Sequence, residues 1–486
     1  MPPLGSKLPG TDRISHGMPG RLLVLSNGHG EDLIALRVIQ ALKQRRPNIE
    51  VVVLPMVGDG AAYRGAEEQG LLRRVGPRRQ LPSGGFSNQS LRGLLADLWA
   101  GVLGLTLRQW RFVRRWGQGG DPGLAVGDLL PLLLAWSGGG PYGFIGTPKS
   151  DYTWAGAPGI AALYHRLKGS EWDPWEWALM RGGRCRLVAM RDRLTARGLR
   201  RHGVAASAPG NPMMDGLDVG TLPLALRQWR RLLLLGGSRM PEATGNLRRL
   251  LEALAEVRCE EPLLVLAPTG SRPAPHEWEP LLQGLGFEPI APPEALADLG
   301  AAAVWARGAR LLLVGPGCFS RWAGWAELGL ASAGTATEQL VGLGIPALSL
   351  PGPGPQFKRG FAERQSRLLG GSVRVCCSPV ALAERAEIVL SQPELACQLG
   401  AIGIQRMGTA GGASPCRGPL RSASWGARTA QRDDGGLINR RVASPHGCSP
   451  GQGLRKSLRT ARQCLEHQHR LGPPQGGSGG SQGGGA

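Results

Sequence analysis

Short apolar runs alternate with amphipathic stretches along most of this chain. Residues 21–25 read Arg-Leu-Leu-Val-Leu, and Leu33, Leu36, Ile39 and Leu42 follow at helical spacing. A continuous apolar run indicates a strand buried on both faces, and apolar residues three or four apart indicate a helix covering a sheet. The predicted strands are residues 21–25, 50–54, 123–126, 187–190, 231–235, 263–267, 311–314 and 347–350, with a strand end near Ser207. This alternation of strand and helix predicts an α/β fold.

The alternation restarts near Gly220, which predicts two doubly wound domains that face a central cleft. The expected parts are a flexible N-terminus (1–19), a first domain (20–219), a second domain (220–392), a helix (393–407) and a tail (408–486). The helix is predicted from Leu395, Ala396, Leu399 and Ile402. The tail has few apolar residues, is rich in glycine and is expected to be disordered and dispensable for the fold.

Charge is unevenly distributed along the chain. The net charge is +21, from 57 Lys and Arg against 36 Asp and Glu; residues 409–486 hold 11 and 3 of these, or +8. A basic surface indicates an anionic partner, which can be nucleic acid, an acidic membrane face or a phosphorylated substrate. The tail has two open explanations: a shifted reading frame, or a basic arm that binds nucleic acid. For the protein as a whole, no nucleic-acid partner is expected.

Cysteine usage and the N-terminus both predict a cytoplasmic protein. The nine cysteines show no zinc-binding spacing and no Cys-x-x-Cys pair, which fits a reducing compartment. Residues 1–19 lack the apolar segment of a signal peptide.

The most apolar region precedes a basic, aromatic segment. Residues 94–107 form a 14-residue, mainly apolar run that Asp97 interrupts, and four arginines interleaved with Trp110, Phe112 and Trp116 follow. The run is shorter than the roughly 20 residues that span a bilayer. Two interpretations stand: a segment that lies on an anionic membrane face, or a core helix with a solvated basic end.

A strand, turn and helix pattern around Gly334 indicates a phosphate site. Gly334 is expected to turn the chain sharply, and Thr335 or Thr337 to cap the helix that follows. Such a helix start attracts phosphate, and Glu338 in its first turn suits the two hydroxyls of a ribose. An ordinary turn with a capping threonine and a solvated Glu338 is the alternative. A second helix is predicted over residues 356–369.

The loop after the first strand carries the second set of candidate groups. Residues 26–32 read Ser-Asn-Gly-His-Gly-Glu-Asp, and the helix is predicted from Leu33. His29 titrates near neutrality and is a candidate acceptor of a proton from a hydroxyl. Asp32 is a candidate to orient His29 or to position a sugar; alternatively it is simply a carboxylate at a helix N-terminus.

These patterns together resemble GT-B glycosyltransferases, and in particular lipid-A-disaccharide synthase and its cyanobacterial synthase-related relatives, over about residues 21–407. The resemblance implies that Asp128, after the strand 123–126, is a general base, although a helix N-cap is the alternative. It also implies that Asn211, where the synthase has histidine, touches the cleft. Arg239 in Gly237-Ser238-Arg239 is implied to bind a diphosphate.

The resemblance implies an inverting transfer of GlcNAc, or an acylated GlcNAc, from a UDP-sugar to a lipid or glycolipid acceptor. The enzyme is expected to lie peripherally on an anionic membrane surface, at the cytoplasmic face, and to use the UDP-sugar as substrate with no cofactor and no metal. The candidate catalytic residues are Asp128, His29 and Asp32. The candidate nucleotide-sugar ligands are Gly237, Ser238, Arg239, Gly334, Thr335, Thr337, Glu338, Gln339 and Gln365. The acceptor-side loop comprises Asn27, Gly28, Gly30 and Asn211.

Two other classes of function remain open. UDP-sugar 2-epimerases share the fold and the donor motif, but they need no second substrate. A non-catalytic basic protein that binds a membrane or nucleic acid is the other alternative.

Overall fold

The computed structural model describes residues 20–76, 102–154, 157, 159–217, 219–237, 240, 242–270, 272–352 and 357–408. These residues belong to one compact unit of the chain. The predictions for the N-terminus, for Ser238 and Arg239, for the start of the second helix at Gln356 and for the tail after Gly408 therefore lie outside the described residues.

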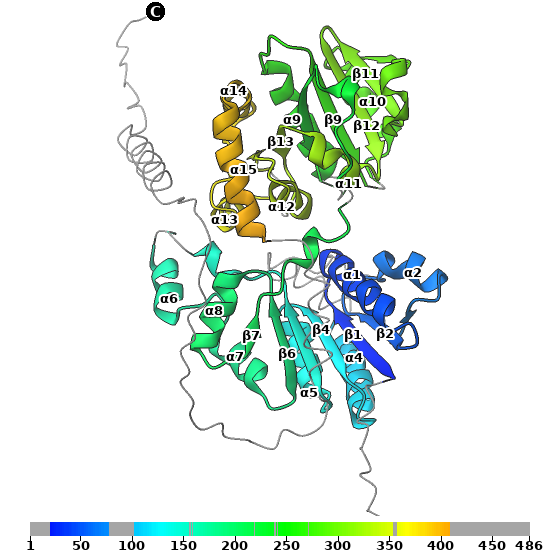
Figure 1. Cartoon of the computed structure of the whole chain (residues 1–486), viewed down its shortest axis with the longest axis vertical. Coiled ribbons are helices and arrows are strands. Elements are labelled where there is room, and N and C mark those ends of the chain that lie inside the picture. Colours follow the sequence, from blue (N-terminus) through cyan, green and yellow to red (C-terminus); the bar gives the residue numbers. More distant parts are fainter. Residues whose placement is uncertain are drawn as a thin grey trace, which may run out of the picture. The chain divides into compact units, whose positions relative to one another are not determined.

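The first half of the chain forms a seven-stranded sheet in the order β3-β2-β1-β4-β5-β6-β7, and every neighbouring pair is parallel (Figure 1). The strands are β1 (Arg21–Ser26), β2 (Glu50–Pro55), β3 (Arg73–Arg74), β4 (Gly123–Gly127), β5 (Tyr142–Gly146), β6 (Cys185–Met190) and β7 (Ala206–Ser207). The helices are α1 (His29–Arg45), α2 (Arg64–Glu68), α4 (Val102–Gln118), α5 (Leu129–Ser137), α6 (Ile160–Lys168), α7 (Pro174–Arg181) and α8 (Arg193–Arg201).

The second half forms an eight-stranded sheet in the order β10-β11-β12-β9-β8-β13-β14-β15. The strands are β8 (Arg230–Leu235), β9 (Leu263–Thr269), β10 (Glu288–Ile290), β11 (Ala303–Arg307), β12 (Arg310–Pro316), β13 (Leu328–Ala331), β14 (Ala347–Ser349) and β15 (Val373–Val375). The helices are α9 (Glu242–Glu256), α10 (Pro275–Gln283), α11 (Phe319–Trp322), α12 (Thr335–Gly342), α13 (Arg359–Leu368), α14 (Pro379–Ser391) and α15 (Pro393–Met407). The edge formed by β10, β11 and β12 is antiparallel.

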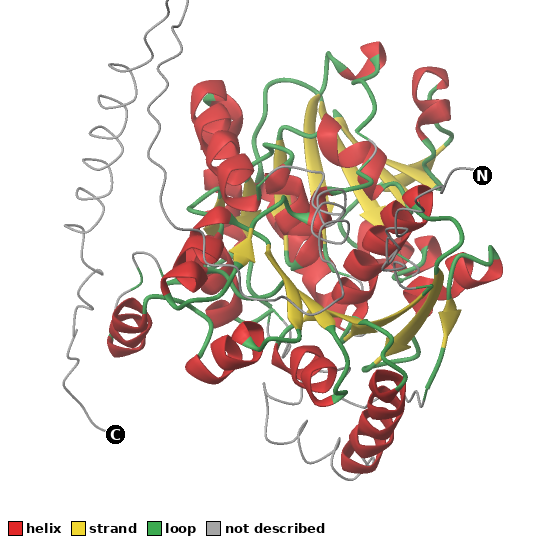
Figure 2. Ribbon diagram, turned by 60° about the horizontal axis from the view of Figure 1, so that its bottom comes forward, coloured by secondary structure: helices red, strands yellow, loops and turns green. Residues whose placement is uncertain are grey.

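Apolar side chains cover both faces of each sheet, as the continuous apolar runs predicted. In β8, Leu232 and Leu234 pack into one cluster, whereas Leu233 and Leu235 pack into another on the opposite face. Successive side chains of a strand point to opposite faces, so a strand buried on both sides is apolar at every position. Figure 2 shows the helices that cover the strands.

Each of the predicted strand runs is a strand, within two residues at either end. The strands β3, β5, β10, β11 and β15 were not predicted. In β5, glycines interrupt the apolar signal, yet close packing needs them: a Cβ at Gly146 would lie 2.7 Å from the Trp172 ring. The hairpin of β11 and β12 turns within two residues, Gly308 and Ala309, which leaves no room for a crossover helix.

The basic, aromatic segment forms α4, and its apolar side faces the core. Leu105 and Val113 are buried, and the buried Gln109 donates a hydrogen bond to the Met56 carbonyl at 3.0 Å. Arg111 and Arg114 are exposed. For the part of this segment that the structure describes, the arrangement favours a core helix with a solvated basic end. No helix among the described residues is long and apolar enough to cross a bilayer.

The predicted helix at residues 393–407 is present as α15, and it packs on α12 through two glycines. A Cβ at Gly400 would lie 2.0 Å from the Gly344 carbonyl oxygen, and one at Gly403 would lie 2.3 Å from the Val341 carbonyl oxygen. Met407, at the end of α15, is fully buried. The last helix therefore fixes the position of α12, whose first turn carries the predicted phosphate site.

Replacing Gly403 with alanine should destabilise the protein, because the new methyl group meets backbone that cannot move aside. We expect the free energy of unfolding to fall by about 1–3 kcal/mol in chemical denaturation. Gly245→Ala is the matched control: Gly245 lies inside α9 with nothing within 4 Å of its Cβ position, so this change should be neutral or stabilise by about 0.4–1 kcal/mol. Equal stability of the two variants would contradict the close packing of α15 on α12.

Candidate functional site

Helix α12 begins without a capping side chain. Its N-cap is Gly334, with φ −87°, and no side chain accepts a hydrogen bond there. The predicted threonine cap is therefore wrong: Thr335 is already helical, and the Thr337 hydroxyl donates to the Ala333 carbonyl at 2.7 Å. The negative φ of Gly334 also means that the turn does not use glycine's left-handed conformation. Glu338 lies in the first turn, as predicted.

Helix α1 begins four residues earlier than predicted. Gly28 is its N-cap, with φ 146°, and the Asp32 amide donates to the Gly28 carbonyl at 2.7 Å. The predicted acceptor-side loop is thus shorter, because Gly30 belongs to the first helical turn and only Asn27 and Gly28 precede the helix. The side chain of His29 is outside what the structure describes, so its role stays a prediction.

The first turns of α1 and α12 face each other, although the two helices follow strands of different sheets. A Cβ placed on Gly30 would lie 3.7 Å from the Thr335 Oγ1 atom. The backbone N–H groups of a helix start carry partial positive charge and attract anions. Two such starts therefore converge on one location.

Carboxylates gather at this junction. Burial, together with the neighbouring charges of Asp128, Asp32 and Glu338, raises the pKa of Glu31 to about 7. A carboxyl group with this pKa is partly protonated at neutral pH, and it can accept or donate a proton there. Glu31 was not predicted; its signal in the sequence is its position beside Asp32 in the glycine-rich segment.

Asp128 is the N-cap of α5, which was the alternative to a general-base role in the sequence analysis. Its Oδ1 atom accepts hydrogen bonds from the Leu130 amide at 3.1 Å and from Asn27 Nδ2 at 2.7 Å. Asn27 is held in turn close to Gly127, where a Cβ would lie 2.1 Å from Asn27 Oδ1. The Asn27 Oδ1 atom is buried without a hydrogen-bond partner. The general-base role of Asp128 is untested by this geometry and stays a prediction.

Asp32 points into the interior of the first half. It is 3% exposed and accepts a hydrogen bond from the Ser26 hydroxyl at 2.6 Å, and the Ser26 oxygen lies 2.7 Å from the Tyr63 hydroxyl. Burial raises the pKa of Asp32 to about 7, although the Ser26 hydrogen bond opposes this rise. Burial likewise raises the pKa of Tyr63 well above its ordinary value.

Glu338 forms an ion pair with Arg191, which follows β6 of the other sheet. Arg191 Nη2 lies 2.9 Å from Glu338 Oε2, and the arginine side chain is 5% exposed. Arg191 Nη1 also donates to the Thr147 carbonyl at 3.4 Å. The Arg191 Nε and Thr147 Oγ1 atoms are buried without hydrogen-bond partners. Sequence reasoning missed Arg191 and Thr147. Arg191 directly follows the predicted strand 187–190, at a strand end where ligand-binding groups of such sheets collect, whereas Thr147 follows β5, which was not predicted.

The remaining predicted residues hold segments around the junction. Gln365 Nε2 donates to the Gly334 carbonyl at 3.0 Å, and its Oε1 atom is buried without a partner. Gln339 Nε2 donates to the Met213 carbonyl at 2.8 Å, and Asn211 Nδ2 donates to the Met407 carbonyl at 3.0 Å. The Gln339 and Asn211 amides bind the two halves of the unit to each other, whereas the Gln365 hydrogen bond lies within the second half.

Position 237 favours glycine, because its φ is 87° and a Cβ there would lie 3.4 Å from the Ser332 carbonyl oxygen. Among the described residues, no group of three or more His, Cys, Asp or Glu lies together in a way that suits a metal ion. The expectation that no metal or cofactor takes part stays a prediction.

Comparison with solved structures identifies the architecture. A putative UDP-N-acetylglucosamine 2-epimerase from Listeria monocytogenes is 13% identical, with 83% of this chain and 96% of that chain covered and a TM-score of 0.51. A UDP-glucosyltransferase from Polygonum tinctorium is 12% identical, with 84% and 99% covered and a TM-score of 0.50. The protein has the GT-B fold.

At these identities the likeness shows the fold alone. No family model matches the chain, and a search of curated proteins finds no match. The predicted fold class is confirmed for the described residues, while the specific resemblance to lipid-A-disaccharide synthase is not shown.

The buried Asp32 should make stability depend on pH. Its pKa is 3.8 in the unfolded chain and about 7 in the folded protein, so between these values the unfolded chain binds fewer protons and stability falls as pH rises. In Asp32→Asn, we expect the decrease in the free energy of unfolding from pH 4 to pH 7 to be smaller by on the order of 2–4 kcal/mol. Glu260→Gln, at an exposed position, is the control. A slope in Asp32→Asn that equals the parent's would show that Asp32 titrates normally.

Proposed function

We propose that the protein is an inverting glycosyltransferase that moves GlcNAc, or an acylated GlcNAc, from a UDP-sugar to a lipid or glycolipid acceptor. It would work at the cytoplasmic face of a membrane. The observation that carries this proposal is the meeting of two uncapped helix starts, one from each half of a GT-B fold, beside the Arg191–Glu338 ion pair and the Glu31 carboxyl.

The donor would bind at the first turn of α12. Its free backbone N–H groups suit a diphosphate, and Glu338 suits the ribose hydroxyls. Gln365 supports this turn by binding the Gly334 carbonyl. Ser238 and Arg239 remain further candidates for the diphosphate.

Binding of the donor would exchange the partners of Arg191. A ribose that takes the Glu338 carboxylate leaves the guanidinium of Arg191 buried and unpaired, which is unfavourable. A diphosphate at the α12 start supplies a new anion within the same junction. The ribose and the diphosphate would thus together replace the internal ion pair.

The chemistry would be direct displacement at the anomeric carbon of the sugar. The acceptor hydroxyl attacks this carbon while its bond to the diphosphate oxygen breaks, and the bonding electrons leave with UDP. The hydroxyl proton passes to a carboxylate, which we assign to Glu31 because its pKa of about 7 matches neutral conditions. Asp128, His29 and Asp32 remain candidates for this role, and the helix starts would stabilise the charge that develops on UDP.

The fold likeness to a putative 2-epimerase keeps one alternative open. An epimerase would convert the sugar nucleotide without a second substrate, whereas a transferase releases UDP only when an acceptor is present.

Turnover of UDP-GlcNAc with and without an acylated glucosamine acceptor tests the proposal. We expect UDP release only with acceptor, and we expect Glu31→Gln to lower kcat by roughly 100-fold or more, since the proton acceptor is lost. Glu68→Gln, at an exposed position on α2, should retain full activity. Formation of an epimeric UDP-sugar without acceptor would favour the epimerase, and the absence of any UDP or UDP-sugar binding would contradict both enzymes.

A further inference from the structure

Helix α6 exposes an apolar face that no other part of the described chain covers. Ile160, Leu163, Tyr164 and Leu167 are 87%, 52%, 51% and 80% exposed. Their spacing of three and four residues puts them on one side of the helix. Single exposed apolar residues are ordinary on a protein surface, but four on one side of a nine-residue helix mark an interaction surface.

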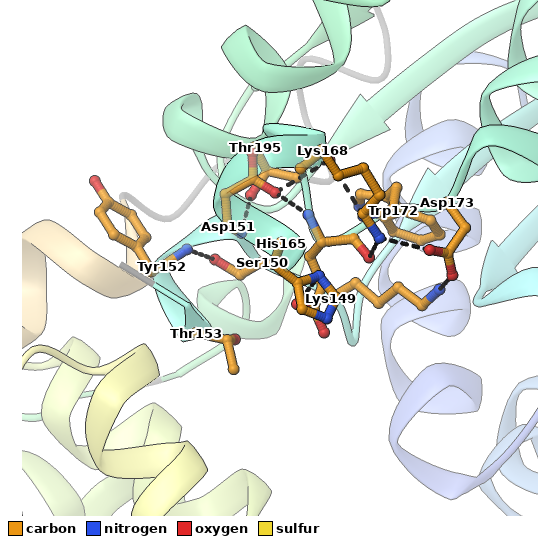
Figure 3. Close-up of polar contacts among 12 residues, drawn as sticks. Lys149, Ser150, Asp151, Tyr152, Thr153, His165, Lys168, Trp172, Asp173 and Thr195 are labelled. Carbon is orange, nitrogen blue, oxygen red and sulfur yellow. Dashed lines mark hydrogen bonds and ion pairs between the residues drawn. The ribbon is translucent and has the colours of Figure 1, made fainter. Parts of the chain in front are cut away.

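The opposite side of α6 is firmly attached to the first half of the protein (Figure 3). The His165 ring stacks on Trp154 with ring centroids 4.1 Å apart, and Ala162 is fully buried. Lys168 forms an ion pair with Asp173. The helix is therefore held in place by its inner side, and the apolar face is turned outward by the fold itself.

Helix α8 lies beside α6 (Figure 1), and both helices carry exposed arginines. Arg166 from α6 and Arg197 and Arg201 from α8 line one cavity of about 170 Å³, which Asp151 and Glu171 also line, and all three arginines are exposed. In the described part of the chain, none of the three forms an ion pair with a carboxylate. An exposed apolar helix face, with exposed arginines on the same and the neighbouring helix, suits the boundary between lipid headgroups and acyl chains.

We propose that this surface, formed by Ile160, Leu163, Tyr164 and Leu167 with Arg166, Arg197 and Arg201, docks onto an anionic lipid bilayer. Below it is called the α6 surface. The apolar side chains enter the headgroup boundary, and the arginines contact lipid phosphates. The inference rests on the proposed membrane location but not on the donor site, and it moves the membrane contact from the α4 segment to α6 and α8.

Charge argues against other occupants of the α6 surface. A second copy of the chain would bring its own arginines against these, in a protein whose net charge is already +21. The C-terminal residues 409–486 carry 11 basic and 3 acidic residues, a charge of +8, and would also be repelled. An anionic lipid surface has the complementary charge.

Co-sedimentation with vesicles of mixed phosphatidylglycerol and phosphatidylcholine tests the proposal, with phosphatidylcholine vesicles for comparison. We expect the full chain to bind the anionic vesicles, and the double variant Leu163→Gln, Leu167→Gln to bind about tenfold or more weakly. The triple variant Arg166→Gln, Arg197→Gln, Arg201→Gln should lose about fivefold for each charge, and only on anionic vesicles.

Two matched controls separate this surface from general effects. Leu224→Gln changes an exposed leucine elsewhere, 76% exposed, and should bind like the parent. The triple variant Arg111→Gln, Arg114→Gln, Arg115→Gln removes the same number of exposed arginines from α4 and should have a smaller effect than the α8-containing triple. Melting temperature and UDP affinity, measured on every variant, show whether fold and donor site are intact.

Three results would overturn the inference. If the parent does not bind anionic vesicles, the membrane location is wrong whatever its UDP affinity. If the parent binds and the leucine variant binds equally, the α6 surface is wrong, and weaker binding of the α4 triple would assign the contact to α4. If the parent is a dimer in sedimentation velocity and the leucine variant is a monomer, the surface binds a second copy instead. If the parent binds anionic vesicles but does not bind UDP, the proposed function is contradicted and the α6 surface is not.

Discussion

The ion pair between Arg191 and Glu338 is the interaction on which the arrangement of this protein depends. It joins the end of β6 in one sheet to the first turn of α12 in the other, and both side chains are largely buried. Removing two charges from water is expensive, and removing one partner of such a pair leaves an uncompensated charge that costs about 3–5 kcal/mol. Because this pair joins the two halves, a ligand that offers either charge a better partner would change how the halves are held together.

The packing around the pair explains why the junction is well defined. Helix α15 crosses onto α12 through Gly400 and Gly403, and its last residue, Met407, contacts Arg191 through Sδ at 3.2 Å. The Met407 carbonyl in turn accepts a hydrogen bond from Asn211. Arg191 thus contacts both the α12 start and the end of α15. The segment before β8 is linked to it indirectly, through the Asn211–Met407 hydrogen bond. The junction is also acidic despite the basic composition of the chain, and the raised pKa of Glu31 lowers the negative charge of the junction at neutral pH.

Much of the sheet architecture could be predicted because a buried parallel strand has to be apolar at nearly every position, as in β1 and β8. Strands such as β5, which alternate glycine with aromatic and aliphatic residues for close packing, lack this signal. The start of α1 was misjudged because glycine disfavours helices on average, whereas Gly28 and Gly30 here begin one. The pairing of Arg191 with Glu338 could not be predicted, because the two residues are 147 positions apart and meet only after both sheets have formed. The Thr337 hydroxyl could equally cap a helix or bond to its own turn, and local sequence does not decide between them.

The central claim, that a nucleoside diphosphate replaces the Arg191–Glu338 pair, is tested most directly by calorimetric comparison of UDP with uridine. Both ligands offer a ribose to Glu338, but only UDP offers an anion to Arg191. The ratio of their affinities therefore measures the contribution of Arg191 to anion binding, because any effect on the unliganded protein is common to both ligands. In Arg191→Met, the account predicts that the preference for UDP over uridine falls by about 10-fold to 100-fold, the loss of a charge-assisted hydrogen bond. An unchanged ratio, in a variant that is folded and binds uridine, would contradict it.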